Sequence, residues 1–450
     1  MDFVSKRGAA MCVLLAGLAA GCVPLRQPNV RLDHVDPEHG YRPHDASKHK
    51  DGGRIWLFLA FSGGGTRAAS FAYGVLEGLR DTQVVIDGKP MRLLGEVDTL
   101  SGVSGGSFPA AYYGLFGDRI FDDFEERFLR KNVQGVLVRQ VLNPLNLVLL
   151  MTPYLNRSDL ASRYYHRNVF DEATFADLAA VRGPRVHINA TDLPSGNTVR
   201  FNQDGFDVIC SDLDPFPIAY AVAASSAVPF LLSPITLRNY AGTCGLEIPE
   251  WFEKALASRE TNPRGWRTAV RAQEFMDSDR KRYIHLVDGG ISDNLGVRMP
   301  LDRIEAIGGV EKTRQLSGLE IPDHLVFVVV NAETEPDPTI DLKAAAPSLA
   351  ASLNLVSGSQ IRRYNFESLL LAKAAIEEME EGLSRSDHPV QGHFVEVSFD
   401  LAPTKEEQRY LKRIPTSFML SDEDVDRLIA AGRQILLDSP AYRALVEQLQ

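Results

Sequence analysis

The chain has 450 residues, of which 44% are hydrophobic and 24% are charged, and it contains 35 glycines and 25 prolines. This is the composition of an ordinary globular protein, and it excludes a disordered, collagen-like or coiled-coil chain. The formal net charge of −11 leaves no basic excess to pair with phosphates, so a nucleic-acid partner is not expected. Length alone allows two or three domains, and the oligomeric state cannot be read from the composition.

The N-terminus has the features of an export signal. A basic pair precedes an uncharged apolar run at residues 9–20, which is too short to span a membrane as a helix. The sequence AAGC at residues 19–22 resembles the end of a bacterial lipoprotein signal, in which the cysteine is lipidated and becomes the mature N-terminus. We therefore expect a signal peptide at residues 1–21 and a lipid anchor on Cys22 that holds the protein to the bacterial cell envelope.

The residues around Cys22 refine this expectation. Val23 stands where an Asp is associated with retention in the inner membrane, so we expect the outer membrane, facing the periplasm. The alternative is an ordinary cleaved signal peptide that happens to contain a cysteine. Residues 22–53 are rich in proline, histidine and charge and have almost no apolar periodicity, which predicts a tether to the folded part.

The folded part is expected to alternate strands and helices. An apolar run at residues 54–61 predicts a buried strand, and the apolar spacing over residues 68–79 predicts a helix. A second apolar segment at residues 97–100 precedes a helical pattern from Ser107. Later strand candidates are residues 186–190, 283–287, 325–331 and 394–399. This alternation predicts an α/β fold with a largely parallel sheet.

A glycine-rich loop follows the first predicted strand. Gly63, Gly64 and Gly65 stand at a strand-to-helix junction, where backbone N–H groups can converge on a phosphate or an oxyanion. The spacing does not fit the G-x-G-x-x-G loop of dinucleotide-binding proteins, and a Walker loop requires Gly-Lys-Ser/Thr. Arg67 is expected to brace the loop and not to act in catalysis.

The second predicted strand runs into Gly102-Val103-Ser104-Gly105-Gly106, which fits the G-x-S-x-G pattern of a nucleophile elbow. Glycines suit this tight turn because no side chain fits beside the serine. The turn holds the serine hydroxyl at the strand end, close to N–H groups at a helix N-terminus. By itself the pattern also occurs in ordinary glycine-rich turns.

Residues 133–151 (VQGVLVRQVLNPLNLVLLM) are strongly apolar, are interrupted by Pro144 and carry Arg139 as a charge. One interpretation is a lid that touches lipid. The interpretation that we favour from the sequence is a buried core helix, because most segments of this kind lie in a core.

Two cysteines, Cys210 and Cys244, remain if the signal is removed and Cys22 is lipidated. In an oxidising compartment they could form one disulfide, although the sequence does not show that they meet. There is no CxxC, HExxH or His/Cys cluster, so no metal is expected, and no motif predicts another cofactor.

The strand expected at residues 283–287 runs into Asp288-Gly289-Gly290. A carboxylate beside two glycines at a strand end is well placed to face an open site, although Asp-Gly is also a common turn. Asp293 and Asn294 follow closely and are expected to cap or orient this loop.

These motifs, in this order, resemble those of the patatin-like phospholipase family, which has a glycine-rich oxyanion loop, then G-x-S-x-G, then D-G-G or D-G-A. The block ASSAVP at residues 224–229 resembles the small-residue block that the family carries between serine and aspartate. The resemblance covers roughly residues 54–310 and departs at Ala68, where the family usually has glycine. It implies a three-layer α/β/α fold with a largely parallel central sheet.

The same resemblance organises the chain into parts. It places a patatin-like domain at residues 54–335, with an insertion near residues 237–282. The segment ETEPDP marks a boundary before residues 336–450, a helix-rich C-terminal region whose role the sequence leaves open.

The resemblance also implies a Ser–Asp dyad. Ser104 would attack an ester carbonyl and Asp288 would accept its proton, since a partly desolvated carboxylate is a stronger base than one in water. N–H groups of Gly64 and Gly65, together with Gly63, would hold the oxyanion. The supporting positions are Arg67, Gly102, Gly106, Gly289 and Gly290. The implied substrate is a phospholipid or lysophospholipid, and the scheme requires no metal.

Two alternatives stay open at this point. A conventional esterase would complete a Ser-His-Asp triad with a histidine downstream of the serine, for which His324, His388 and His393 are the candidates. A non-catalytic lipid-binding lipoprotein of the cell envelope could use the same fold, because a fold does not fix a function.

Overall fold

The computed structural model describes residues 28–43, 53–152, 155–229, 231–336, 340–342 and 344–450. The expected signal peptide and Cys22 lie outside these residues. The centre of the molecule is an eight-stranded sheet in the order β12-β11-β2-β5-β6-β10-β9, with β7 also paired to β6. The strands are β2 (Ile55–Phe61), β5 (Val97–Val103), β6 (Arg185–Asp192), β7 (Thr198–Arg200), β9 (Ile235–Arg238), β10 (Tyr283–Asp288), β11 (His324–Asn331) and β12 (Gln391–Ser398).

The direction of the strands changes partway across the sheet. Neighbouring strands from β12 to β6 are parallel, whereas β10 runs antiparallel to both β6 and β9. The sheet is therefore mixed, with a parallel centre, as the alternation of strands and helices predicts.

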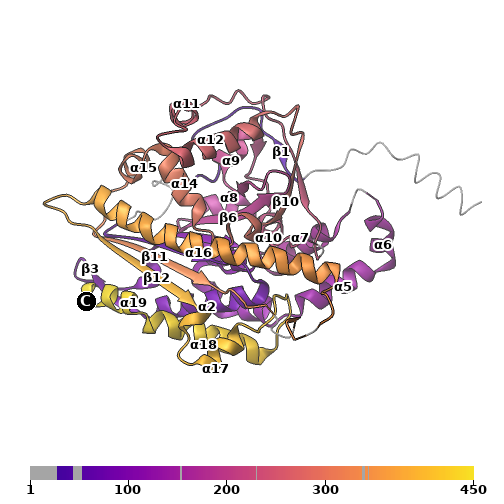
Figure 1. Cartoon of the computed structure of the whole chain (residues 1–450). Helices are drawn as coiled ribbons and strands as arrows, with labels where there is room; N and C mark the ends of the chain where they lie inside the picture. Colours follow the sequence, from indigo (N-terminus) through magenta and orange to yellow (C-terminus); the bar gives the residue numbers. More distant parts are fainter. Residues whose placement is uncertain (1–27, 44–52, 153–154, 230, 337–339, 343) are drawn as a thin grey trace, which may run out of the picture.

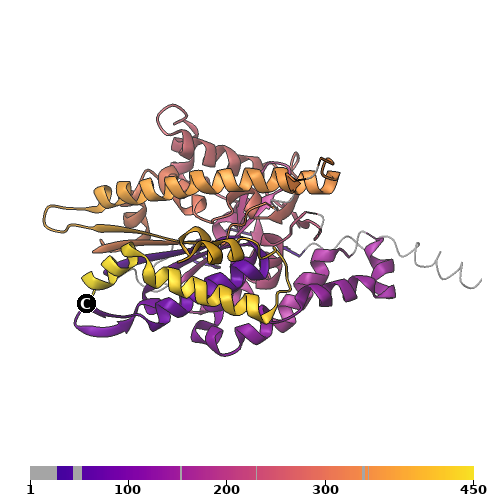
Figure 2. The ribbon, with the colours of Figure 1, turned by 60° about the horizontal axis from the view of Figure 1, so that its bottom comes forward.

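Helices cover both faces of the sheet and make three layers, which confirms the predicted α/β/α fold (Figures 1 and 2). One face is covered by α2 (Gly65–Asp81), α3 (Ser107–Phe116) and α18 (Asp422–Asp438), and the other by α14 (Arg298–Ile307) and α16 (Leu349–Leu383). Strand β2 shows why its apolar run is continuous. Leu57 and Leu59 belong to the core on one face, and Phe58 and Ala60 to the core on the other.

The C-terminal residues complete the same sheet and core. Strand β12 forms an edge of the sheet beside β11. Helix α18 crosses α2 closely, because a Cβ on Gly74 would lie 2.0 Å from the Ile429 carbonyl oxygen and one on Gly432 would lie 2.2 Å from that of Phe71. Helices α17 (Lys405–Leu411) and α19 (Pro440–Gln448) flank α18 in the sequence.

The expected insertion near residues 237–282 contains α11 (Glu250–Leu256) and α12 (Pro263–Met276). These helices contact α14 and share a small core of their own. Other strands and α-helices are β1 (Val30–Arg31), β3 (Gln83–Ile86), β4 (Lys89–Arg92), α4 (Ile120–Phe124), α7 (Arg157–Asn168), α8 (Phe175–Ala180), α9 (Gln203–Val208), β8 (Ser211–Asp212), α10 (Ile218–Ser225), α13 (Gly290–Asp293) and α15 (Val310–Ser317).

The expectation of a tether is wrong for residues 28–43, which pack against the folded part. Strand β1 pairs with β8, and the Tyr41 side chain is buried, with its hydroxyl donating to the Val186 carbonyl. The Arg42 guanidinium forms buried or half-buried ion pairs with Asp204 and Asp207. The sequence pattern missed this because one aromatic ring and one buried cation dock the segment without apolar periodicity.

The expectation that residues 133–151 lie in the core is also wrong. They form α5 (Val133–Leu142) and α6 (Pro144–Leu150), which extend away from the sheet (Figures 1 and 2). Leu142 is 67% exposed and Leu145 is 69% exposed. Among the described residues, no single helix is long and apolar enough to cross a membrane; α5 and α6 pass that test only as a pair bent by 79°.

The docked N-terminal segment gives a stability prediction. We expect Arg42→Ala to lower the free energy of unfolding by about 3 kcal/mol, because it leaves the buried Asp207 carboxylate without its cation. Arg31→Ala, which removes an exposed pair with Asp33, should change it by less than about 1 kcal/mol. Urea unfolding measures both, and equal effects of the two substitutions would contradict a docked segment.

Candidate active site

The register of the sheet brings Ser104 and Asp288 together across β6. Val103 of β5 pairs with Asn189 of β6, and Asp288 of β10 pairs with the next residue, Ala190, from the other side. The side chains meet over β6, where the Ser104 hydroxyl donates a hydrogen bond of 2.7 Å to Asp288 Oδ2. Strand β5 is parallel to β6 and β10 is antiparallel to it, so the two strands run in opposite directions where they end at Ser104 and Asp288.

The Ser104 backbone is held in a strained turn. Its φ is 50°, in the left-handed region that disfavours side chains other than glycine. Its N–H donates to Ser225 Oγ at 2.9 Å, and this hydroxyl in turn donates to the Asn189 carbonyl at 2.6 Å. Ser225 therefore links the end of α10 to the serine turn and to β6. The sequence marked the block around Ser225 but assigned the residue no role.

The Asp288 carboxylate is buried, with both oxygens engaged. Oδ2 accepts from Ser104, and Oδ1 accepts from the Gly290 N–H at 2.8 Å. Burial raises the pKa of Asp288 to about 6, although both hydrogen bonds favour the ionised form and oppose the shift. At neutral pH the group is therefore ionised but more basic than an exposed aspartate.

The glycine loop lies directly beside the serine. A Cβ on Gly63 would lie 3.2 Å from the Ser104 Cβ, and one on Gly105 would lie 2.0 Å from the Gly65 carbonyl oxygen. Helix α2 begins at Gly65, so N–H groups of its first turn have no partner within the helix. The positive φ values of Gly64 (144°) and Gly65 (62°) explain why glycine is needed there.

Gly63 does not fit its predicted role as an oxyanion donor. Its N–H donates to the Asn294 carbonyl at 3.1 Å, so in this structure the donor is already used. This bond ties the glycine loop to the turn that follows Asp288. Asn294, expected from the sequence to cap or orient its loop, thus connects the two motifs.

The remaining predicted glycines lie where backbones touch. A Cβ would lie 2.6 Å from Ser107 Cα at Gly102, 2.6 Å from the Phe61 carbonyl oxygen at Gly106, and 2.2 Å from the Asn189 carbonyl oxygen at Gly289. Side chains at these positions would push the serine turn, the first strand and β6 apart.

Arg67 connects the glycine loop to the C-terminal residues. Its guanidinium donates to the carbonyls of Ala332 and Ile414 and to the Thr416 hydroxyl. The next residue in this segment, Ser417, accepts the Thr66 N–H at 2.9 Å. Burial lowers the pKa of Arg67 to about 10, which leaves it protonated at neutral pH. No motif in the sequence indicates that residues 414–417 reach the site.

The candidate histidines lie away from Ser104. His324 pairs with Ile55 at the start of β2. The glycine loop follows Phe61, which is six residues further along, at the end of the same strand. Six residues of strand span about 20 Å. His393 contacts His324, and His388 lies 3.3 Å from Asp323, which precedes β11. In the described part of the chain, no histidine hydrogen-bonds to Ser104 or Asp288, and the triad receives no support.

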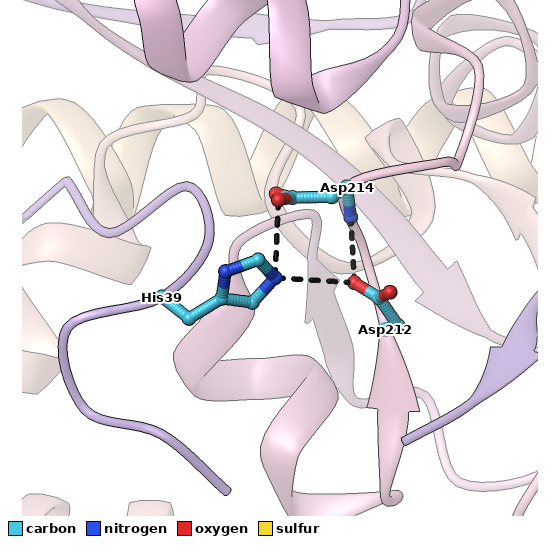
Figure 3. Close-up of side chains that lie close together, drawn as sticks. All are labelled: His39, Asp212 and Asp214. Atoms are coloured by element: carbon cyan, nitrogen blue, oxygen red, sulfur yellow. Dashed lines mark hydrogen bonds and ion pairs between the residues drawn. The ribbon is translucent and has the colours of Figure 1, made fainter. Parts of the chain in front are cut away.

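One group among the described residues has the ligand types for a metal. His39 Nε2 lies 3.1 Å from Asp214 Oδ2 and 3.9 Å from Asp212 Oδ1 (Figure 3). Asp212 is the last residue of β8, Asp214 lies in the turn that follows, and His39 belongs to the docked N-terminal segment. His39 contacts both carboxylates, and the Asp214 N–H donates to Asp212 Oδ1 at 3.0 Å, so these contacts hold the segment to β8.

Cys210 and Cys244 form a disulfide. Their carbonyl oxygens accept backbone N–H groups from Leu32 and Val35, so the bridged segments also support the docked N-terminus. The structure thus answers the question that the sequence left open.

The raised pKa of Asp288 gives a stability prediction. The folded state binds this proton up to pH about 6, whereas the unfolded chain releases it near pH 4, so the group destabilises the fold progressively as pH rises between these values. We expect Asp288→Asn to stabilise the protein by about 3 kcal/mol at pH 8 and to have little effect at pH 4. Urea unfolding at both pH values measures this; a variant that is less stable at pH 8 than at pH 4, relative to wild type, would contradict it.

A known family and several solved structures are similar to this chain. The model of the family described as patatin-like phospholipase matches residues 59–301, more than half of the chain. No curated protein matches the sequence. Human GIVD cytosolic phospholipase A2 is similar at 12% identity and a TM-score of 0.46, with 95% of this chain and 66% of that chain covered. Its complex with methyl gamma-linolenyl fluorophosphonate gives 12% identity and a TM-score of 0.40, with 88% and 59% covered. The chain thus spans less than two thirds of the length of these proteins.

Proposed function

The chain belongs to the patatin-like phospholipase family, and on this premise we propose that it is a serine hydrolase acting on lipid carboxylic esters through Ser104 and Asp288. The main support for the proposal is the hydrogen bond of 2.7 Å between the Ser104 hydroxyl and the buried Asp288 carboxylate. The substrate class that we propose is a phospholipid or lysophospholipid.

In the first half of the reaction, Ser104 Oγ attacks the ester carbonyl carbon while its proton passes to Asp288 Oδ2. The N–H groups of Gly64 and Gly65, beside the serine, stabilise the tetrahedral oxyanion. When the intermediate collapses, the carbon–oxygen bond to the alcohol breaks, and the alcohol takes the proton from Asp288. The acyl group stays on Ser104.

In the second half, water attacks the acyl-serine and gives a proton to Asp288. The second tetrahedral intermediate collapses to a free fatty acid, and Ser104 recovers its proton from Asp288. A single carboxylate serves as base and then as acid in each half, which suits a pKa of about 6, close to the working pH.

The function is tested by fatty-acid release from phospholipid vesicles with a chelator present. We expect Ser104→Ala and Asp288→Asn each to lower release by about 1,000-fold or more, because either change removes the nucleophile or its base. His324→Ala and His393→Ala, which lie far from the serine, serve as controls and should retain turnover. No release by the wild type would favour the non-catalytic lipid-binding lipoprotein, and loss in a histidine variant would favour the triad.

The pH profile tests the base independently. The reaction needs ionised Asp288, so kcat/KM should be constant above pH about 6 and fall about tenfold per pH unit below it. Hydrolysis of a soluble ester between pH 4 and pH 8 measures this, with circular dichroism to show that the fold persists. A profile that rises with a midpoint near pH 4 would show an unperturbed carboxylate.

We further propose that the protein is anchored in the bacterial cell envelope through a lipid on Cys22, at the outer membrane facing the periplasm. The disulfide between Cys210 and Cys244 supports an oxidising compartment. Cys22→Ser is expected to abolish incorporation of labelled fatty acid into the protein and to shift it from the membrane fraction to the soluble fraction. Labelling that persists in this variant would place the lipid elsewhere.

A further inference from the structure

Helices α5 and α6 form an exposed apolar extension, here called the arm (residues 133–151). Val138, Leu142, Leu145, Leu147, Val148, Leu149 and Met151 are all exposed large apolar residues of this one segment. In α6 these residues point to more than one side of the helix, which neither a core helix nor an ordinary surface helix shows. Exposing this apolar surface to water is unfavourable, and such patches mark sites that bind a membrane or another molecule.

The arm keeps its shape through polar groups at its bend. Asn143 Oδ1 accepts the Leu145 N–H at 3.0 Å, and Asn146 Nδ2 donates to the Gln140 carbonyl at 2.9 Å. These bonds satisfy the backbone where the two helices meet at 79°. The apolar side chains are thus presented on two short helices joined at a hydrogen-bonded bend.

The base of the arm is joined to the candidate active site. The Gln134 N–H donates to the Phe418 carbonyl, and Gln134 Oε1 accepts the Ser417 hydroxyl at 2.9 Å. The Ser417 carbonyl accepts the N–H of Thr66 in the glycine loop. The arm also protrudes beyond the end of the sheet toward which the arrows of β11 and β12 point (Figures 1 and 2).

The charges of this segment fit a phospholipid surface. From residue 127 to residue 158 the sequence has no Asp or Glu, while Lys131 stands at the base of the arm and Arg139 within it. Positive side chains beside a patch of aliphatic groups match the anionic phosphates and hydrocarbon of a bilayer. A protein partner has no comparable support in these residues.

We propose that the arm inserts its apolar side chains into the surface of a phospholipid bilayer and so sets the edge that carries Ser104 against the lipid. The catalytic benefit of placing Ser104 at the lipid surface rests on the proposed function. Lipid binding by the arm is itself a physical property that can be measured without catalysis.

Insertion is tested in the full-length chain by fluorescence. Vesicles of phosphatidylethanolamine and phosphatidylglycerol with brominated acyl chains are added to the variant Leu145→Trp. We expect the emission of the introduced tryptophan to shift to shorter wavelength and to be quenched by the bromine atoms. The matched control is Leu316→Trp in α15, also an exposed leucine (64%), which should remain unquenched. The emission of the chain's three tryptophans is subtracted using wild type. Because the probe reports from the arm, an N-terminal anchor does not produce the signal.

The consequence for turnover uses a triple variant, Leu142→Gln, Leu145→Gln and Val148→Gln. Its ratio of vesicle hydrolysis to hydrolysis of a soluble short-chain ester should fall about tenfold or more relative to wild type, because interfacial apolar area is lost. Leu316→Gln should leave the ratio as in wild type.

The outcomes separate the two proposals. Absence of quenching at Leu145→Trp, or an unchanged ratio in the triple variant of an active enzyme, would overturn the arm as a lipid-binding element. Quenching at Leu145→Trp in a protein that hydrolyses no ester would support the arm and refute the proposed function.

Discussion

The hydrogen bond between Ser104 and Asp288 joins the ends of two strands, β5 and β10, that lie on either side of β6. Strand β6 separates them by two strand spacings, about 10 Å between backbones. The serine must then project from a strained turn, and the aspartate must lean over β6 while staying out of water. The small residues around both groups follow from this, because a Cβ on Gly289 would collide with the Asn189 carbonyl of β6.

The burial of Asp288 beside the serine also raises the pKa of its carboxyl group. An aspartate in water is too weak a base to activate a hydroxyl, whereas a desolvated one gains basicity at the expense of stability. Hydrogen bonds from the Ser104 hydroxyl and the Gly290 N–H limit this cost, because both favour the ionised carboxylate and oppose the rise of its pKa. In the proposed mechanism the proton passes directly from Ser104 to Asp288, because their oxygens lie 2.7 Å apart.

Apolar runs and glycine spacing are local signals, and from them the sequence predicted the parallel centre of the sheet and the motifs around Gly64, Ser104 and Asp288. The three layers were implied by the resemblance to the patatin-like family. The sequence could not predict contacts made by distant residues. The antiparallel direction of β10, the bond from Gly63 to Asn294 and the approach of Ser417 to the glycine loop depend on packing. Apolarity also cannot distinguish a core helix from an exposed one, so the sequence favours a core position for the arm although its side chains are exposed.

In the proposed mechanism Ser104 carries the acyl group between the two halves of the reaction. Mass spectrometry of the acid-quenched enzyme, taken during turnover of a slowly hydrolysed lipid ester, can detect this intermediate. We expect one added acyl group on the peptide that contains Ser104, and none in Ser104→Ala. An acyl group on another residue, or turnover in Ser104→Ala with no adduct, would contradict this mechanism.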